Sequence, residues 1–165
     1  MSDTFASVKL FVIMLFFWIL LNGALAFDVI LVGAVIAGSI TLFFGSSEHF
    51  LSGYRLTLGS ARATLGYAGY FLNELVKANL SVARVVLNPA LPIKPAIVRV
   101  RTRLRNPGAR LLLANSITLT PGTLTVEMNG EWLYVHWVVT ETTDPAAATE
   151  AIVTGFEKYL EQMYD

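Results

Sequence analysis

Apolar residues fill the first third of the chain almost without interruption, whereas apolar and polar residues alternate in the last third. Within residues 10–47 the only charged residue is Asp28. A helix needs about 20 apolar residues to cross the hydrocarbon core of a bilayer, so this block is long enough for two crossings. Gly23 lies near its middle and favours a tight turn. The pattern therefore predicts a transmembrane helical hairpin, with helices over residues 8–26 and 29–44.

Small residues recur at a spacing of four in the second predicted helix. Gly33 is followed by Ala37, and Ala34 by Gly38. This spacing lets helix backbones approach closely in lipid. We expect these residues to pack against the first helix, or against a helix of another protein. Asp28 lies at the turn, where it can be hydrated or can cap the second helix, so we do not expect it to carry ions.

A cleaved signal peptide is the alternative to the first membrane helix. Lys9, the apolar run after it and the triplet Ala24-Leu25-Ala26 resemble the three regions of such a peptide. The acidic Asp3 and the second apolar segment that follows at once are atypical. Cleavage would leave a single span, and we favour the hairpin.

Residues 54–87 continue with a helical pattern that is amphipathic rather than uniformly apolar. Glu74 and Lys77 are three residues apart, a spacing at which opposite charges pair on a helix. A third membrane span would have to bury these two charges and Arg84 at considerable cost. We therefore favour two spans over three, and expect this helix to lie at the membrane surface.

Prolines end the helical pattern at Pro89, Pro92 and Pro95, because proline cannot continue a helix. They predict a stiff link between the membrane-associated part and a second domain. The predicted regions are a transmembrane hairpin over 1–47, an amphipathic membrane-associated helix with its proline-rich link over 48–95, and a cytoplasmic α+β domain over 96–165.

The last region has the pattern of a small β-α-β-β-α domain. Strict alternation over residues 97–105 is typical of a strand with one buried face. Asn129-Gly130 predicts a hairpin turn, and Asp144 followed by Pro145 predicts the start of a helix. The predicted elements are, in order, strand 97–105, helix 109–118, strand 123–128, strand 131–140 and helix 145–163. We thus expect a membrane protein of the α+β class.

Two sets of side chains in this domain are candidates for contact with lipid or another protein. In the first strand Val98, Val100, Thr102 and Leu104 form one face, and arginines form the other. The last strand is apolar on both faces, so its aromatic face needs cover. A solvated basic face is the alternative, but the nearby membrane segment favours anionic headgroups or an acidic protein. The candidate residues are Arg99, Arg101, Arg103, Arg105, Trp132, Tyr134 and His136.

The net charge of zero conceals an uneven distribution of charge along the chain. Residues 75–126 contain eight basic residues and no acidic one, whereas residues 127–165 contain eight acidic residues and only Lys158 as a base. The acidic tail would repel phosphate, which argues against nucleic acid as a partner. The basic segment follows the apolar block, so the positive-inside rule predicts a cytoplasmic C-terminal domain. With two spans the N-terminus is also cytoplasmic, and with three it is outside.

No pattern in the chain predicts an active site or a cofactor. The absence of cysteine excludes disulfides, cysteine-bound metal and a thiol nucleophile. His49 is a lone histidine that we expect to be solvated. Ser116, His136 and Asp144 could be named as a triad, but nothing in their spacing supports one. We therefore expect no catalytic residues, no metal, no cofactor and no small-molecule substrate.

Three sequence blocks carry a family resemblance. They are LLANSITLTPGT at 112–123, LYVHW at 133–137 and FFWILLNG at 16–23. Together they resemble the E-type (MnhE/MrpE) subunits of the Mrp-type multisubunit Na⁺/H⁺ antiporters, a family also represented in related membrane-bound respiratory and hydrogenase complexes. The resemblance implies a plasma-membrane subunit whose partners are large complex-I-like subunits and several small membrane subunits. It gives weight to Asn115, Thr118, Thr120, Pro121, Gly122 and Thr123 as a structural motif.

Two functional hypotheses follow from the residues and the resemblance together. The first is a non-catalytic accessory subunit that supports assembly and stability of a cation/proton antiporter, or of a related respiratory complex. The second is a membrane-tethered module that recruits an acidic soluble partner through the arginine strand. An autonomous enzyme or carrier is disfavoured, because two spans cannot easily enclose an ion path.

Overall fold

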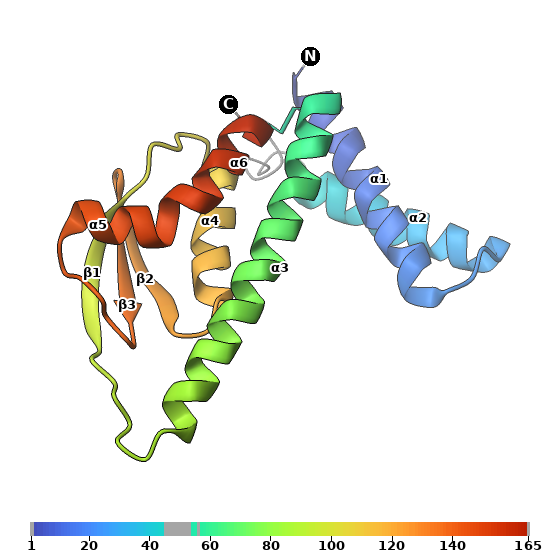
Figure 1. The fold of residues 1–165 in the computed structure, drawn as a ribbon. Helices are drawn as coiled ribbons and strands as arrows, with labels where there is room; N and C mark the ends of the chain where they lie inside the picture. The colour runs from blue at the N-terminus through green and yellow to red at the C-terminus, as the bar shows by residue number, and fades with distance from the viewer. Residues whose placement is uncertain (1, 45–53, 56, 165) are drawn as a thin grey trace. The chain divides into compact units, whose positions relative to one another are not determined.

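The computed structural model describes residues 2–44, 54–55 and 57–164, and the side chains from residue 7 onward within these ranges. The chain divides into two compact units, Met1–Ser52 and Gly53–Asp165, and each unit is described by itself. The first contains two helices, and the second contains a long helix, a small sheet and further helices (Figure 1).

The first unit is a helical hairpin. Helix α1 spans Ser2–Asn22 and helix α2 spans Phe27–Phe44. Gly23 ends α1 because it takes a left-handed backbone conformation, with φ of 64°, which glycine adopts without strain. The helix therefore ends earlier than the predicted residue 26. Asp28 is exposed in the first turn of α2.

One helix among the described residues, α2, is long and apolar enough to cross a membrane by length and composition. It has 18 residues with a mean hydropathy of 2.2. The apolar part of α1, Ser7–Asn22, is shorter, so the second span stays a prediction.

Helix α3 spans Leu58–Leu87 and belongs to the second unit. Thr57 caps its N-terminus by accepting a hydrogen bond from the backbone N–H of Ser60 at 3.1 Å. The predicted region 48–95 contains this helix. In the structure α3 packs along α6 (Gly155–Tyr164) and shares the core of the α+β domain.

The sheet has three strands in the order β1-β3-β2, and both pairs are antiparallel. Strand β1 spans Ala96–Arg101, β2 spans Thr123–Asn129 and β3 spans Trp132–Trp137. The predicted hairpin between β2 and β3 is present, but Asn129 is the last residue of β2, and Gly130, at φ of 55°, and Glu131 form the turn. The predicted strand 97–105 ends at Arg101. Thr102 N–H still donates to the Glu131 carbonyl, but the Thr102 hydroxyl and the Arg103 N–H bond to Glu157 of α6. The predicted strand 131–140 likewise ends at Trp137.

Helix α4 spans Pro107–Leu119 and is capped by Asn106, whose side chain accepts from two backbone N–H groups. The predicted helix 145–163 contains a π-helical turn: α5 (Pro145–Thr149), η1 (Glu150–Thr154) and α6 follow one another. Ala148 and Val153 are both buried although they are five residues apart. The wider π turn explains this, since that spacing places residues on different sides of a regular α-helix.

The core lies on one face of the sheet. It contains Val98, Val100, Leu133 and Val135 from the strands, Leu113 and Ile117 from α4, and Val153, Phe156 and Leu160 from η1 and α6. Helix α3 adds Ala63, Tyr67, Tyr70 and Phe71 from the far side of this cluster. The core is thus enclosed between α3 and the sheet, and the other face of the sheet is open.

Candidate functional site: interaction surfaces

The contact between α1 and α2 centres on Trp18 and Gly33. The indole Nε1 of Trp18 donates a 3.0 Å hydrogen bond to the backbone carbonyl of Val29. A Cβ atom added at Gly33 would lie 2.3 Å from Cδ1 of Trp18, so this position requires glycine. Gly33 and Ala37 are buried in the hairpin, whereas Ala34 and Gly38 are only partly buried. Of the two predicted small-residue pairs, Gly33 and Ala37 are therefore the pair that is buried between α1 and α2.

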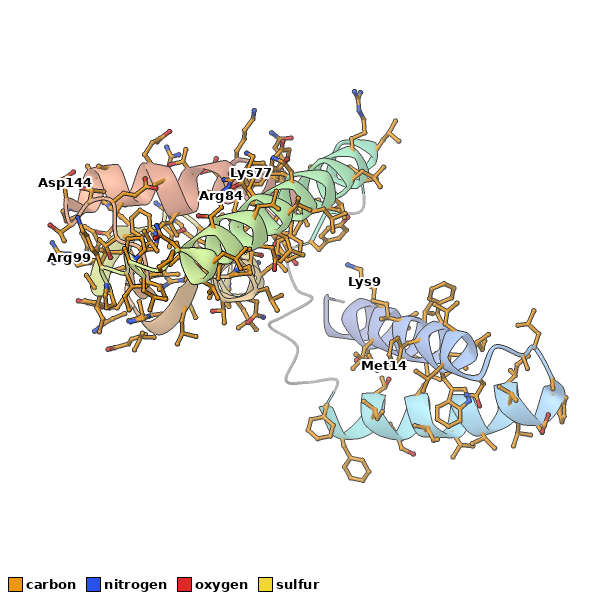
Figure 2. The ribbon with its side chains drawn as sticks, turned by 60° about the horizontal axis from the view of Figure 1, so that its bottom comes forward. Lys9, Met14, Lys77, Arg84, Arg99 and Asp144 are labelled. Carbon is orange, nitrogen blue, oxygen red and sulfur yellow. The ribbon has the colours of Figure 1, made fainter. Side chains whose placement is uncertain are left out.

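Large apolar side chains cover the outside of the hairpin (Figure 2). Phe16, Leu21, Val35 and Leu42 are exposed by 61%, 70%, 62% and 86%. Soluble monomers rarely expose so much contiguous apolar surface. The hairpin therefore needs lipid or neighbouring helices around it.

Hydroxyl groups of the threonines in the block 115–123 connect α4 and β2 by hydrogen bonds. The Thr123 hydroxyl contacts two carbonyls, those of Ile117 at 2.6 Å and Thr120 at 2.9 Å. The Thr118 hydroxyl accepts a 3.2 Å hydrogen bond from the backbone N–H of Thr125. The Thr120 hydroxyl donates to the Ser116 carbonyl at 2.8 Å. These bonds satisfy backbone groups at the end of a helix and the edge of a strand.

The other members of the block have different environments. Asn115 is exposed, and its side chain has no hydrogen bond within the described residues. Pro121 and Gly122 make the turn into β2, with Gly122 at φ of 95°. A Cβ atom at Gly122 would lie 3.6 Å from Val82 of α3, so the turn also contacts the long helix.

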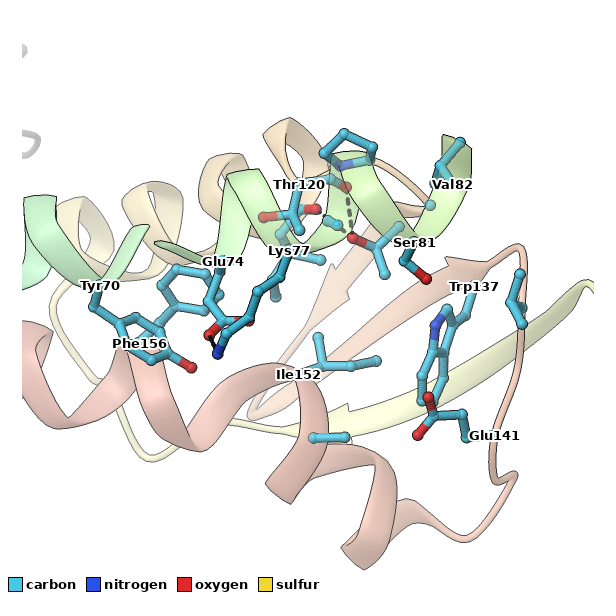
Figure 3. A pocket seen from close by; sticks show the side chains of 17 residues that line it. Tyr70, Glu74, Lys77, Ser81, Val82, Thr120, Trp137, Glu141, Ile152 and Phe156 are labelled. Carbon is cyan, nitrogen blue, oxygen red and sulfur yellow. Dashed lines mark hydrogen bonds and ion pairs between the residues drawn. The ribbon is translucent and has the colours of Figure 1, made fainter. Parts of the chain in front are cut away.

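A cleft of about 270 Å³ opens between this turn and the second half of α3 (Figure 3). Its apolar walls include Val82, Ile117, Trp137 and Ile152. The predicted ion pair lines it and is confirmed, with Lys77 Nζ 2.9 Å from Glu74 Oε1. The cleft is lined by both apolar and polar side chains, and its charged residues are Glu74, Lys77 and Glu141.

The open face of the sheet carries an aromatic row on its central strand. Trp132, Tyr134 and His136 lie opposite Arg101, Arg99 and Ile97 of β1. The Arg99 guanidinium lies 4.2 Å from the centre of the Trp132 ring, a cation–π contact. Ile97 on this face is 61% exposed. No helix of the described residues covers this face.

The four arginines of the predicted basic face have separate environments. Arg99 and Arg101 lie on the open face, and Arg101 pairs with Glu131 at 2.8 Å. Arg103 instead reaches α6, with Nε 3.3 Å from Glu157 Oε2 and 3.7 Å from Glu161 Oε1. Arg105 is exposed. The basic strip is therefore interrupted where β1 ends, because a buried carboxylate attracts Arg103.

Glu157 is not among the residues predicted from the sequence, and it is only 3% exposed. Its Oε1 accepts hydrogen bonds from the Thr102 hydroxyl at 2.5 Å and from the Arg103 N–H at 2.7 Å. A buried carboxylate is tolerated when it is bonded and paired in this way. Two features of the sequence could have identified this contact. Glu157 lies four residues after the buried Val153, and Thr102 lies on the buried face of the strand pattern.

Three tyrosines surround the contact between α3 and the domain core. Burial raises the pKa of Tyr67, Tyr70 and Tyr164 above the usual tyrosine value. The hydroxyl of Tyr67 is hydrogen-bonded to that of Ser116, which is buried. The Tyr70 ring packs edge-on against Phe156, with ring centres 5.0 Å apart.

The structure does not bring together the residues of the rejected triad. Ser116 lies in the helix-covered core, His136 on the opposite face of the sheet, and Asp144 caps α5 by accepting from Ala147. Among the described residues no group of three or more histidine, aspartate or glutamate side chains could hold a metal ion. His49 lies outside the described residues.

The apolar hairpin and the α+β domain are consistent with a subunit of a membrane complex. The family model described as Na⁺/H⁺ ion antiporter subunit (MNHE) matches residues 11–163. The chain belongs to this family of Na⁺/H⁺ antiporter subunits, and the predicted resemblance to E-type subunits is confirmed.

Curated relatives and a solved structure support this assignment. The E-type Na⁺/H⁺ antiporter subunit of Bacillus subtilis (strain 168) is 30% identical over 158 residues, with 94% of this chain and 96% of the relative covered. The E1-type subunit of Staphylococcus haemolyticus (strain JCSC1435) is 29% identical over 157 residues, with 92% of each covered. A chain of the membrane-bound sulfane sulfur reductase, an archaeal respiratory membrane complex, matches with a TM-score of 0.83 and 32% identity over 96% of this chain and 99% of that chain. The homologues are thus components of transporters and of a respiratory complex.

Proposed function

We propose that this chain is an accessory, non-catalytic subunit of a multisubunit cation (Na⁺)/proton antiporter in the plasma membrane. Its relatives are named antiporter subunits, and its hairpin exposes apolar side chains that neighbouring helices can cover. The described membrane part consists of two helices, which are too few to enclose an ion path. We infer that the large partner subunits carry the ions, and that this chain supports assembly and stability.

The proposed orientation puts the α+β domain in the cytoplasm. The arginines at 99, 101, 103 and 105 directly follow the predicted membrane-associated region 48–95, and Arg55 and Arg62 lie nearer the end of α2; these cations favour a cytoplasmic location by the positive-inside rule. Two membrane helices would put the N-terminus on the same side. Labelling of single cysteines introduced at Ser2 and Leu124 in intact cells tests this arrangement, since both should react only after permeabilisation.

A second candidate function is the equivalent subunit of a related respiratory membrane complex. The observation that favours it is the match to a chain of the sulfane sulfur reductase complex over nearly the whole of both chains. Both candidates share the accessory role and differ in the large subunits that surround the chain.

Purification of the tagged chain from its native membranes tests the role and distinguishes the two candidates. Large multispan subunits should co-purify, together with antiporter subunits in the first case and with redox subunits in the second. Deletion of the chain should lower cation/proton exchange in everted vesicles along with the amount of assembled complex. Recovery of a lone chain, or normal exchange and assembly after deletion, would overturn the proposal.

A further inference from the structure

Helix α3 carries an exposed apolar stripe on the side that faces away from the domain core. The side chains concerned are 53% to 82% exposed. At 3.6 residues per turn they fall within a sector of about 80°, so they form one continuous line along the helix. The α3 stripe consists of Leu58, Leu65, Leu72, Val76, Leu80 and Leu87.

The opposite side of α3 is already occupied by the folded domain. Ala63 is buried, and Tyr67 and Tyr70 pack against Phe156 of α6. Further along, Val82 approaches the turn at Gly122. The core therefore covers one side of α3, and the stripe is the side that remains for another partner.

Basic residues dominate the exposed charges of α3. Arg62 and Arg84 are exposed and have no acidic partner within 4 Å among the described residues. The one acidic residue of the helix, Glu74, is bonded to Lys77 and its side chain is 26% exposed. Arg62 lies at the edge of the stripe and Arg84 beside it. An apolar stripe with cations along its edge is complementary to a leaflet with anionic headgroups.

The chain length holds α3 close to a membrane. Helix α2 ends at Phe44 and α3 begins at Leu58, so thirteen residues connect them. Such a segment spans at most about 45 Å when fully extended. With α2 in the bilayer, the beginning of α3 therefore lies within about 45 Å of the end of α2, a distance that permits α3 to lie on the membrane surface.

We propose that α3 lies in the plane of an anionic membrane surface, with the α3 stripe in the lipid and the domain core on its aqueous side. The stripe runs along the whole helix, about 45 Å, as an in-plane anchor requires. A spanning orientation would draw the packed core and the free arginines into the hydrocarbon, at a large cost.

Single-cysteine labelling tests this proposal, because the natural chain has no cysteine. Leu65, Leu72 and Leu80 are each replaced by cysteine in the full chain and labelled with an environment-sensitive fluorophore. The protein is reconstituted in vesicles of phosphatidylcholine and phosphatidylglycerol that contain a quencher at a known lipid depth. Ile97→Cys and Leu124→Cys are matched controls, since these apolar residues of the sheet are also exposed, by 61% and 49%.

The three α3 labels should be quenched by shallow lipid quenchers to a similar extent, and the two sheet labels should stay accessible to aqueous iodide. Omitting phosphatidylglycerol, or introducing Arg62→Gln with Arg84→Gln, should reduce the quenching of the α3 labels. Quenching no stronger than at the sheet would overturn the proposal. So would a depth that increases steadily along α3, which indicates a spanning helix. The same labels in the assembled complex in native membranes give a third test: shielding from iodide without lipid quenching means that a protein covers the stripe, which would also overturn the proposal.

Discussion

The Thr102 hydroxyl donates a 2.5 Å hydrogen bond to the buried carboxylate of Glu157, and this bond ties the end of β1 to α6. The same oxygen also accepts from the backbone N–H of Arg103. The backbone N–H of Thr102 still donates to the Glu131 carbonyl at 2.9 Å, and from Arg103 onward the chain bonds to α6 instead of the sheet. This change of partner explains why β1 ends while the alternation of buried and exposed residues continues to Arg105.

Glu157→Ala should destabilise the α+β domain by about 2–3 kcal/mol, because it leaves the Thr102 hydroxyl and the Arg103 N–H without their acceptor. The measurement is the midpoint of thermal unfolding followed by near-ultraviolet circular dichroism in detergent. Glu161→Ala is the matched control. It removes only the longer, 3.7 Å contact of Arg103 and should cost less than about 1 kcal/mol. Equal effects of the two substitutions would contradict this account.

Gly33→Ala should weaken the hairpin, since the added methyl group meets the Trp18 ring. Overpacking of this kind costs about 1–3 kcal/mol, which outweighs the gain of roughly 1 kcal/mol from better helix propensity. Gly38→Ala is the control, because a Cβ atom there lies 4.0 Å from Phe11 and fits. The temperature at which the detergent-solubilised chain aggregates should fall for the first variant and stay equal or rise for the second.

Thr123→Val should lower stability by about 1–2 kcal/mol because it removes the hydroxyl that contacts two carbonyls at the end of α4. Thr123→Ser keeps the hydroxyl and should recover most of the loss. Asn115→Ala, at an exposed position of the same block, should change stability by less than about 0.5 kcal/mol. Thermal unfolding of the three variants in parallel checks this order, and a large effect at Asn115 would indicate a role outside the fold.

Alkaline pH should destabilise the contact between α3 and the domain. The pKa of Tyr67, Tyr70 and Tyr164 is higher in the folded chain than in the unfolded chain, mainly because of burial. The folded state therefore holds these protons more tightly. The resulting stabilisation is complete below the unfolded pKa of about 10 and is lost as pH rises through the folded values. Unfolding midpoints measured between neutral pH and pH 11 should fall, and Tyr67→Phe should make the fall shallower.

Arg99→Glu should weaken retention of the chain in its complex if the open face of the sheet contacts an acidic partner. The charge reversal also removes the cation–π contact with Trp132. Arg105→Glu, at an exposed position beyond the strand, is the control. The measurement is the ratio of co-purified large subunits to tagged chain. An unchanged ratio with Arg99→Glu would contradict contact between this face and an acidic partner.

Local patterns in the sequence were enough to predict much of the α+β domain. Alternation predicted the buried side of β1, Asn129-Gly130 predicted the hairpin, and Asp144 with Pro145 predicted the start of α5. The π turn was not predictable in this way, because its cause is the need to bury both Ala148 and Val153 against a sheet formed by distant residues.

The candidate surfaces were predicted less completely than the elements. The strand pattern predicts one row of arginines, whereas Arg103 turns towards α6. The reason is a partner 54 residues away in the chain, which no periodicity reveals. The amphipathic pattern of α3 likewise did not show that one side of the helix belongs to the domain core. That assignment needed the contacts of Tyr67 and Tyr70 with Phe156.

The enclosure of the core between α3 and the sheet has a geometric consequence. The α3 stripe lies on one side of the second unit, and the aromatic row of Trp132, Tyr134 and His136 lies on the opposite side. A partner bound to the α3 stripe would be separated from a partner bound to the open face of the sheet by the thickness of the domain. The thickness of the unit would therefore set the distance between two partners bound at these faces.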